Sequence, residues 1–199
     1  MIANGRTATL ADRIGGSSWA RDAVLVVGSS LIVGLMAQVE IRLPGTPVPV
    51  TLQPLAVFLL GAALGSRRAA LAMLAYLAEG SAGLPFFAGG SAGLARLLGP
   101  TGGYLIGFVP SAFAIGFLAE RGWDRTPTRA FAAMFLGSIV LFACGLARLA
   151  AFVPRDQVLR LGLFPFIVGD VLKMLAAAGL LPGLWWFLDR GGLRPPRRV

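Results

Sequence analysis

Histidine is absent from the 199-residue sequence, and its absence removes every kind of site that depends on an imidazole. Catalytic triads with a histidine base and metal centres with histidine ligands are therefore excluded. Cys144 is the only cysteine and lies in an apolar run, so the chain can form neither an internal disulfide nor a thiolate cluster. We interpret Cys144 as a small packed hydrophobic residue and expect neither a metal site nor a cofactor.

Charged residues are scarce. They make up 14% of the chain, against about 25% in soluble domains, while 56% is hydrophobic and the mean hydropathy is +0.77. Lys173 is the only lysine, and the other basic side chains are arginines. Most of the chain must therefore lie in a lipid bilayer, as one membrane domain.

Six apolar segments predict six membrane-spanning helices. They are residues 24–39, 55–64, 69–77, 104–119, 130–152 and 164–188. The second and third are short of the roughly 20 residues that a full span needs, so we expect short or tilted helices there. The predicted fold is an all-α integral membrane protein with an N-terminal tail (1–21), a six-helix membrane domain (22–190) and a basic C-terminal tail (191–199). No signal-peptide core precedes the first segment, which we therefore expect to be retained.

The arginines predict the orientation. If the six segments cross in turn, twelve arginines lie on the side of both termini and four on the other. The positive-inside rule then places both termini in the cytoplasm and the protein in the cell (inner) membrane. This distribution also explains the net charge of +9 without nucleic acid as a partner.

Two outer connections have unusual compositions. Residues 40–53 contain Pro44, Pro47 and Pro49, which fix an extended path, and we expect a shaped lid. Residues 80–103 are rich in glycine and proline but nearly uncharged, with Arg96 as the only ionic residue inside them. We expect structured loops that cap a pocket, with glycines in left-handed backbone conformations.

Small residues four apart favour close helix contacts. Ser30 and Gly34 form such a face on the first helix, with two uses open: internal packing or docking to a partner protein. Two further faces are predicted for helix packing: Gly61 with Gly65, and Gly103 with Gly107 and Ser111.

Asp170 and Lys173 share a face of the last predicted helix because they are three residues apart. Ionisable residues at membrane depth are expensive and usually line a cavity, although a purely structural ion pair is the alternative. Arg96 lies in the loop expected above them. Together these groups suit a small amphiphilic anion. Arginine binds carboxylates, and the Asp170 acceptor beside the Lys173 donor matches a ligand group in which an N–H adjoins a C=O.

Four segments together resemble the BioY family, the biotin-specific substrate-binding (S) components of energy-coupling-factor (ECF) transporters. The segments are PVPVTLQ (47–53), GLPFFAGG (83–90), LGPTGGYL (98–105) and GDVLK (169–173). The resemblance covers residues 24–188. It implies a substrate-binding domain with a high-affinity biotin site near the outer face and no enzymatic activity.

The resemblance also implies roles for individual residues. Asp170 and Lys173 would serve the ureido ring of biotin, and Arg96 the valerate carboxylate. The remaining expected ligand-binding residues are Thr51, Gln53, Phe86, Gly89, Gly90 and Tyr104. A loop asparagine found in some members has no counterpart between Val50 and Tyr104, and Glu79, Ser81 or Ser91 are the possible replacements.

The implied partners are biotin, a transmembrane coupling (T) component and ABC-type ATPases, because the chain has no Walker motif. Ser30 and Gly34 would then be the docking face. A stand-alone carrier, facilitative or coupled to protons through Asp170, is the alternative. An intramembrane enzyme using Glu79, Asp170 and Lys173 is disfavoured because nothing marks a nucleophile or a metal.

Overall fold

The structure, a computed structural model, describes residues 7–13 and 18–190, and it is mostly helical. Six of its helices have twelve residues or more, one at each of the six predicted segments. They are α2 (Trp19–Ala37), α3 (Gln53–Leu64), α4 (Ser66–Ser81), α6 (Gly102–Ala119), α7 (Pro127–Leu149) and α9 (Phe164–Arg190). The predicted C-terminal tail, 191–199, lies outside the described residues.

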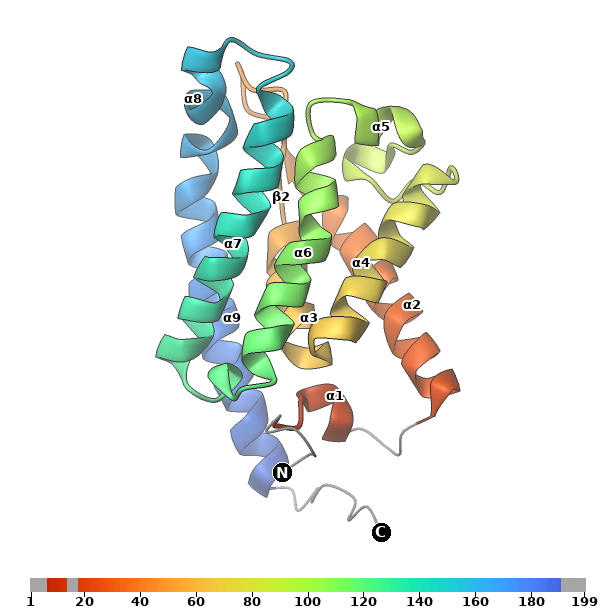
Figure 1. The fold of residues 1–199 in the computed structure, drawn as a ribbon, viewed down its shortest axis with the longest axis vertical. Coiled ribbons are helices and arrows are strands. Elements are labelled where there is room, and N and C mark those ends of the chain that lie inside the picture. The colour runs from red at the N-terminus through yellow and green to blue at the C-terminus, as the bar shows by residue number, and fades with distance from the viewer. Residues whose placement is uncertain (1–6, 14–17, 191–199) are drawn as a thin grey trace.

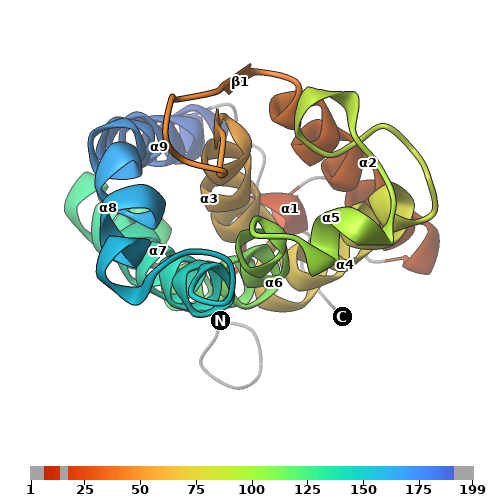
Figure 2. The ribbon, with the colours of Figure 1, turned by 90° about the horizontal axis from the view of Figure 1, so that it is seen from above.

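The long helices form two rows of three (Figures 1 and 2). Seen from above, α9, α3 and α2 follow one another on one side, and α7, α6 and α4 face them. Helix α6 packs against α3, α4 and α7, so it is the centre of the bundle. The buried core follows these contacts, with Phe58, Tyr76 and Ile115 fully enclosed.

Local sequence signals set several helix starts. Ser18 caps α2 by accepting a hydrogen bond from the backbone N–H of Arg21. Prolines begin α3 and α7, where a missing backbone N–H costs nothing. Gly122, in the left-handed conformation at φ 81°, makes the turn after α6 that leads into α7.

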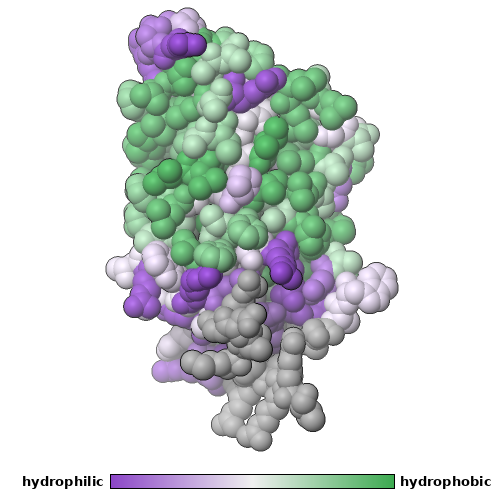
Figure 3. Space-filling view, in the orientation of Figure 1, coloured by the Kyte–Doolittle hydropathy of each residue, from purple (hydrophilic) through white to green (hydrophobic). Residues whose placement is uncertain are grey.

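Four helical stretches are long and apolar enough to cross a membrane. They are Trp19–Ala37, Gly102–Ala119, Pro127–Leu149 and Arg155–Arg190. Helix α3 is apolar but has only 12 residues, and α4 has 16, as expected for the two short segments. Figure 3 shows a broad hydrophobic band on the visible face, with hydrophilic residues gathered mainly at the α1 end. The chain is a membrane protein.

Glycines allow α6 to approach its neighbours closely, as predicted. A Cβ atom added at Gly103 or Gly107 would lie 2.4 or 3.0 Å from atoms of Cys144 on α7. On α3, a Cβ atom at Gly61 would lie 3.2 Å from the side chain of Ile115 on α6. From the α7 side, a Cβ atom at Gly145 would lie only 2.3 Å from the ring of Tyr104.

The face formed by Ser30 and Gly34 packs inside the molecule. Ser30 is fully buried, and its hydroxyl oxygen lies 2.8 Å from the Val27 carbonyl oxygen and 3.0 Å from Oε1 of Glu79 on α4. A Cβ atom at Gly34 would lie 3.1 Å from the ring of Phe86. A partner protein cannot reach this face, which corrects the prediction that Ser30 and Gly34 form a docking surface.

The end of the bundle opposite α1 is covered by ordered connections (Figure 1). Residues 40–51 form a hairpin from two short antiparallel strands, β1 (Glu40–Ile41) and β2 (Val50–Thr51). The glycine-rich connection contains the 3₁₀ turn η1 (Ala88–Gly90) and the short helix α5 (Leu94–Leu98). Gly83, Gly89, Gly90 and Gly93 have φ between 68° and 111°, as expected.

The connection between α7 and α9 completes this cover. It forms the 3₁₀ turn η3 (Arg155–Gln157) and the short helix α8 (Val158–Gly162). The hydroxyl of Thr46 in the hairpin donates a 2.7 Å hydrogen bond to the carbonyl of Leu161 in α8. Two connections that are distant in sequence are therefore joined directly.

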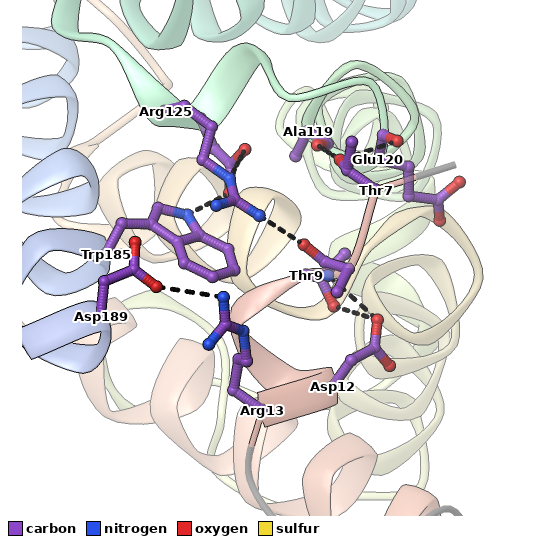
Figure 4. Close-up of polar contacts among 11 residues, drawn as sticks. Thr7, Thr9, Asp12, Arg13, Ala119, Glu120, Arg125, Trp185 and Asp189 are labelled. Carbon is purple, nitrogen blue, oxygen red and sulfur yellow. Dashed lines mark hydrogen bonds and ion pairs between the residues drawn. The ribbon is translucent and has the colours of Figure 1, made fainter. Parts of the chain in front are cut away.

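At the opposite end, contacts around a tryptophan of α9 hold the short helix α1 (Leu10–Arg13) against the bundle (Figure 4). The guanidinium of Arg125, in the 3₁₀ turn η2 (Trp123–Arg125), lies 3.3 Å from the ring centroid of Trp185 on α9. The indole N–H donates a 2.6 Å hydrogen bond to the buried carboxylate of Asp124. Arg13 of α1 forms a 3.1 Å ion pair with Asp189.

A second set of polar contacts holds α1 against α4. The Asp12 carboxylate accepts hydrogen bonds from Arg68, at 2.8 Å, and from the backbone N–H and hydroxyl of Thr9, both at 3.0 Å. Burial raises the pKa of Asp12, but these hydrogen bonds outweigh it and hold the pKa below its ordinary value of 3.8. Deprotonated Asp12 therefore stabilises the folded state.

The glycine contacts predict that adding one methyl group lowers the stability of the protein at a crowded glycine but not at an open one. Gly145→Ala should lower the free energy of unfolding by about 1–3 kcal/mol, because the new Cβ atom would overlap the Tyr104 ring. Gly179→Ala is the matched control on α9, where a Cβ atom meets nothing within 4 Å. Thermal unfolding in detergent measures both, and equal midpoints would contradict the close contact.

The Asp12 contacts predict a pH-dependent stability. Asp12→Asn should destabilise the protein by about 1–2 kcal/mol at pH 7, where a charge-assisted hydrogen bond is lost. Because the pKa of folded Asp12 lies below 3.8, this contribution is present above about pH 4 and disappears as the pH falls through the lowered pKa. The difference from the wild type should therefore shrink in unfolding curves recorded at lower pH. The control variant Asp156→Asn removes an exposed acid at the other end of the protein, and its difference in stability from the wild type should not shrink in this way at lower pH.

Candidate ligand-binding site

A cavity lies beneath the ordered connections, between the two rows of helices. Its empty space is about 660 Å³, the open mouth included, and its lining is mostly apolar. Pockets for small molecules typically place a few polar groups on a mostly apolar wall, as this cavity does. The polar and charged side chains that line it are Thr51, Gln53, Ser91, Arg96, Thr101, Tyr104, Asp170 and Lys173.

The ion pair of Asp170 and Lys173 is part of this lining. The Lys173 ammonium lies 2.8 Å from Oδ1 of Asp170, and the two residues are 9% and 3% exposed. Both lie in the first three turns of α9, on the side that faces the bundle. The pair leaves the second carboxylate oxygen and the remaining ammonium protons for a ligand, so one side of the cavity offers an acceptor beside a donor.

Three aromatic rings form one wall of the cavity. Tyr104, Phe142 and Phe166 have ring centroids 6.2 to 6.4 Å apart, in T-shaped or tilted arrangements. The Tyr104 hydroxyl donates a 2.8 Å hydrogen bond to the carbonyl of Gly162 in α8. Tyr104 therefore presents its ring to the cavity while its polar end supports the connection above.

Thr51 and Gln53 come from the proline-rich segment and lie where the hairpin meets α3. The Thr51 hydroxyl accepts a hydrogen bond from the Gln53 backbone N–H and donates one to Oε1 of Gln53, both at 3.3 Å. The buried Gln53 amide also donates a 2.6 Å hydrogen bond to the Tyr76 hydroxyl. This network holds both side chains in place beside the cavity.

Arg96 lies at the mouth. Its side chain lines both the inner cavity and a smaller outer hollow formed with the hairpin residues Glu40, Arg42 and Thr46. Arg96 is exposed and forms no ion pair with an acid in residues 7–13 or 18–190. A carboxylate at the mouth would therefore meet a guanidinium that is free to bind it.

Six of the nine predicted ligand-binding residues line the cavity: Thr51, Gln53, Arg96, Tyr104, Asp170 and Lys173. Phe86, Gly89 and Gly90 do not. The Phe86 ring packs on Gly34, Gly89 lies against the side chains of Glu40 and Arg42, and Gly90 donates its N–H to Gln38. Their neighbours Phe87 and Ala88 face the cavity instead.

Several lining residues carried no usable sequence signal. Phe108, Leu141 and Phe142 lie in long apolar helices, where lipid-facing and cavity-facing positions have similar compositions. Among the proposed replacements for the loop asparagine, only Ser91 lines the cavity, and its hydroxyl donates to the Ala88 carbonyl. Glu79 instead accepts the hydrogen bond from Ser30.

A larger hollow, with about 1650 Å³ of empty space when the open solvent is included, lies at the α1 end, between α2 and α4. Two of its acids, Asp12 and Asp22, pair with Arg68 in its wall. These pairs are partly exposed, so the hollow lacks an enclosed ion pair like that of Asp170 and Lys173. In the described part of the chain, no group of histidine, cysteine, aspartate and glutamate residues is arranged to hold a metal ion.

Known proteins resemble this chain over most of its length. The biotin transporter BioY of Rhizobium etli is 39% identical over 167 residues, which cover 79% of this chain and 89% of that protein. The biotin transporter BioY of Rhodobacter capsulatus is 40% identical over 164 residues, covering 72% and 86%. The biotin transporter BioY of Thermotoga maritima is 39% identical over 139 residues, covering 69% and 81%.

A solved structure shares the fold. The crystal structure of the S-component for biotin from an ECF-type ABC transporter superposes with a TM-score of 0.77 at 25% sequence identity. The match covers 86% of this chain and 95% of that one. The model of the BioY family matches residues 6–190, which confirms the resemblance inferred from the four motifs. The chain belongs to the BioY family.

Proposed function

We propose that this protein is the biotin-binding membrane subunit of an uptake system, an S component that a separate T component and ABC-type ATPases energise. The buried pair of Asp170 and Lys173 in the wall of an apolar cavity, with Arg96 at the mouth, carries the proposal. Biotin has a cyclic urea at one end and a carboxylate at the other, which matches this distribution of groups. The relatives are named as transporters, in agreement with the expectation that the chain is not an enzyme.

Each end of the ligand has a chemical reason to bind where we place it. The urea C=O would accept from the Lys173 ammonium, and a urea N–H would donate to the Asp170 carboxylate. The aliphatic chain would lie along the rings of Tyr104, Phe142 and Phe166, and the carboxylate would pair with Arg96. Thr51, Gln53 and Ser91 remain candidates for further contacts with the urea or the chain.

For the membrane arrangement we propose six spans with both termini in the cytoplasm. The supporting observation is the position of the charges. Arg67, Arg68, Arg121 and Arg125 lie at or beside the helix ends near α1, opposite the cavity. The positive-inside rule then puts the cavity mouth on the outer side of the membrane.

The direct test is equilibrium binding of labelled biotin to the purified protein, with a panel of other vitamins as competitors. One biotin per chain, displaced only by close analogues, is the expected result. Uptake measured with and without a co-expressed coupling module tests the energy source. Full uptake by the chain alone, abolished by a proton ionophore, would support the stand-alone proton-coupled carrier instead.

Removing either charge of the buried pair should weaken binding. Asp170→Asn and Lys173→Ala are each expected to raise the biotin Kd at least tenfold, roughly 1.4 kcal/mol, because each removes one contact to the urea. Isothermal titration calorimetry measures the effect, and Asp156→Asn is the control for loss of an acid elsewhere.

A double variant separates ligand contact from structural pairing. Asp170→Asn with Lys173→Gln removes both charges, so neither is left buried without its partner. We expect near wild-type thermal stability and binding still at least about tenfold weaker. Wild-type affinity in the double variant would show that the pair only holds helices together.

Arg96 should discriminate biotin from ligands that lack its negative charge. The wild type is expected to bind biotin at least about tenfold more tightly than biotinamide, and Arg96→Ala should remove most of that preference. Arg155→Ala, an exposed arginine in the α7–α9 connection at the same end, is the matched control. An unchanged ratio of the two Kd values in Arg96→Ala would place the carboxylate elsewhere.

A further inference from the structure

The turn η1 lies between the cavity and the outer hollow. Ala88 and Arg96 line both spaces, and so does Pro49 of the hairpin, so the glycine-rich connection and the hairpin together form the partition at the mouth. The residue just before the turn is firmly packed: Phe87 is 1% exposed, and its ring centroid lies 5.5 Å from that of Tyr76. The tip, residues 88–90, has two glycines in left-handed conformations and no buried side chain.

The side chain of Gln38 makes several polar contacts with this segment. The Gln38 amide nitrogen, at the end of α2, lies 2.9 Å from the carbonyl oxygen of Gly34, 3.3 Å from that of Pro85 and 3.5 Å from that of Phe87. Its Oε1 accepts a 2.9 Å hydrogen bond from the Gly90 N–H. The amide thus joins backbone carbonyls that precede the tip to the N–H of Gly90 at the end of the tip.

A second contact lies beside the first. Glu40 in β1 and Arg42, which follows β1, form a 2.8 Å ion pair. A Cβ atom added at Gly89 would be 2.6 Å from Nη2 of Arg42 and 2.7 Å from Oε1 of Glu40, so the pair rests directly on the tip. Gln38 and this ion pair therefore fasten the tip to the segment that joins α2 to the hairpin.

We propose that Gln38 is a positioning residue that keeps the tip closed over the cavity and so sets how fast a ligand enters and leaves. It does not line the cavity, so it acts through Phe87, Ala88 and Gly90. Breaking its hydrogen bonds favours an open mouth in both the empty and the loaded protein. Association and dissociation are therefore both accelerated, as expected for gating by a loop.

Two substitutions of similar volume test the role of Gln38. Gln38→Met removes all of the hydrogen bonds of the amide. Gln38→Glu keeps the acceptor for the Gly90 N–H but replaces the donor by a carboxylate oxygen, which the nearby backbone carbonyl oxygens repel. Gln157→Met is the control, because Gln157 is exposed on the same end of the protein. In stopped-flow measurements, Gln38→Met and Gln38→Glu should both accelerate biotin dissociation roughly fivefold and also speed association. The control should leave both rates unchanged.

The kinetic readout rests on the proposed biotin binding, so a second measurement is made without ligand. Hydrogen exchange followed by mass spectrometry should show the 86–91 amides exchanging roughly fivefold faster in Gln38→Met than in the wild type or the control. Arg42→Ala removes an exposed side chain, is not expected to affect folding, and should give a smaller change of the same sign.

Unchanged exchange in Gln38→Met would overturn the inference whether or not the protein binds biotin. Faster exchange with unchanged biotin rates would overturn the gating role alone. A wild type that fails to bind biotin would refute the proposed function, and the exchange result would still decide whether Gln38 holds the tip.

Discussion

The arrangement of this protein depends on keeping one paired carboxylate and ammonium group inside a largely apolar membrane domain. Each charge alone would be expensive in such surroundings, so Asp170 and Lys173 are placed three residues apart, where α9 pairs them at 2.8 Å. The helices around them leave a cavity instead of packing the pair into a core. The aromatic wall, the Thr51–Gln53 network and the covering connections all surround the space beside it.

Much of the fold follows from the sequence because lipid restricts the choices. A backbone in a bilayer must satisfy its hydrogen bonds within helices, so apolar runs separated by arginine-, proline- or glycine-rich segments predict helix positions well. The small residues of α3 and α6 predicted close packing, and the contacts of Gly61, Gly103 and Gly107 confirm it. Small residues predict that another segment packs closely against a helix, but they do not say which segment. For this reason Ser30 and Gly34 were assigned to a partner protein, although Glu79 and Phe86 of the same chain fill that face.

The candidate site was partly predictable for a related reason. Charged and polar residues are rare here, so Arg96, Asp170, Lys173, Thr51 and Gln53 stand out, and all of them line the cavity. Apolar residues carry no such mark, because a helix between lipid and a cavity is hydrophobic all round. Phe142 and Leu141 could not be distinguished from lipid-facing neighbours. In the glycine-rich segment, sequence identified the loop but not which residues face inward: Phe87 and Ala88 do, whereas Phe86, Gly89 and Gly90 hold the loop in position.

The central claim is that a single biotin molecule spans the cavity from the buried pair to the arginine at the mouth. An experimental structure of the protein with biotin bound tests it most directly. The account predicts the urea ring within hydrogen-bonding distance of Asp170 and Lys173, with the carboxylate on Arg96. Biotin bound in the hollow between α2 and α4, or in the cavity without contact to the pair, would contradict it.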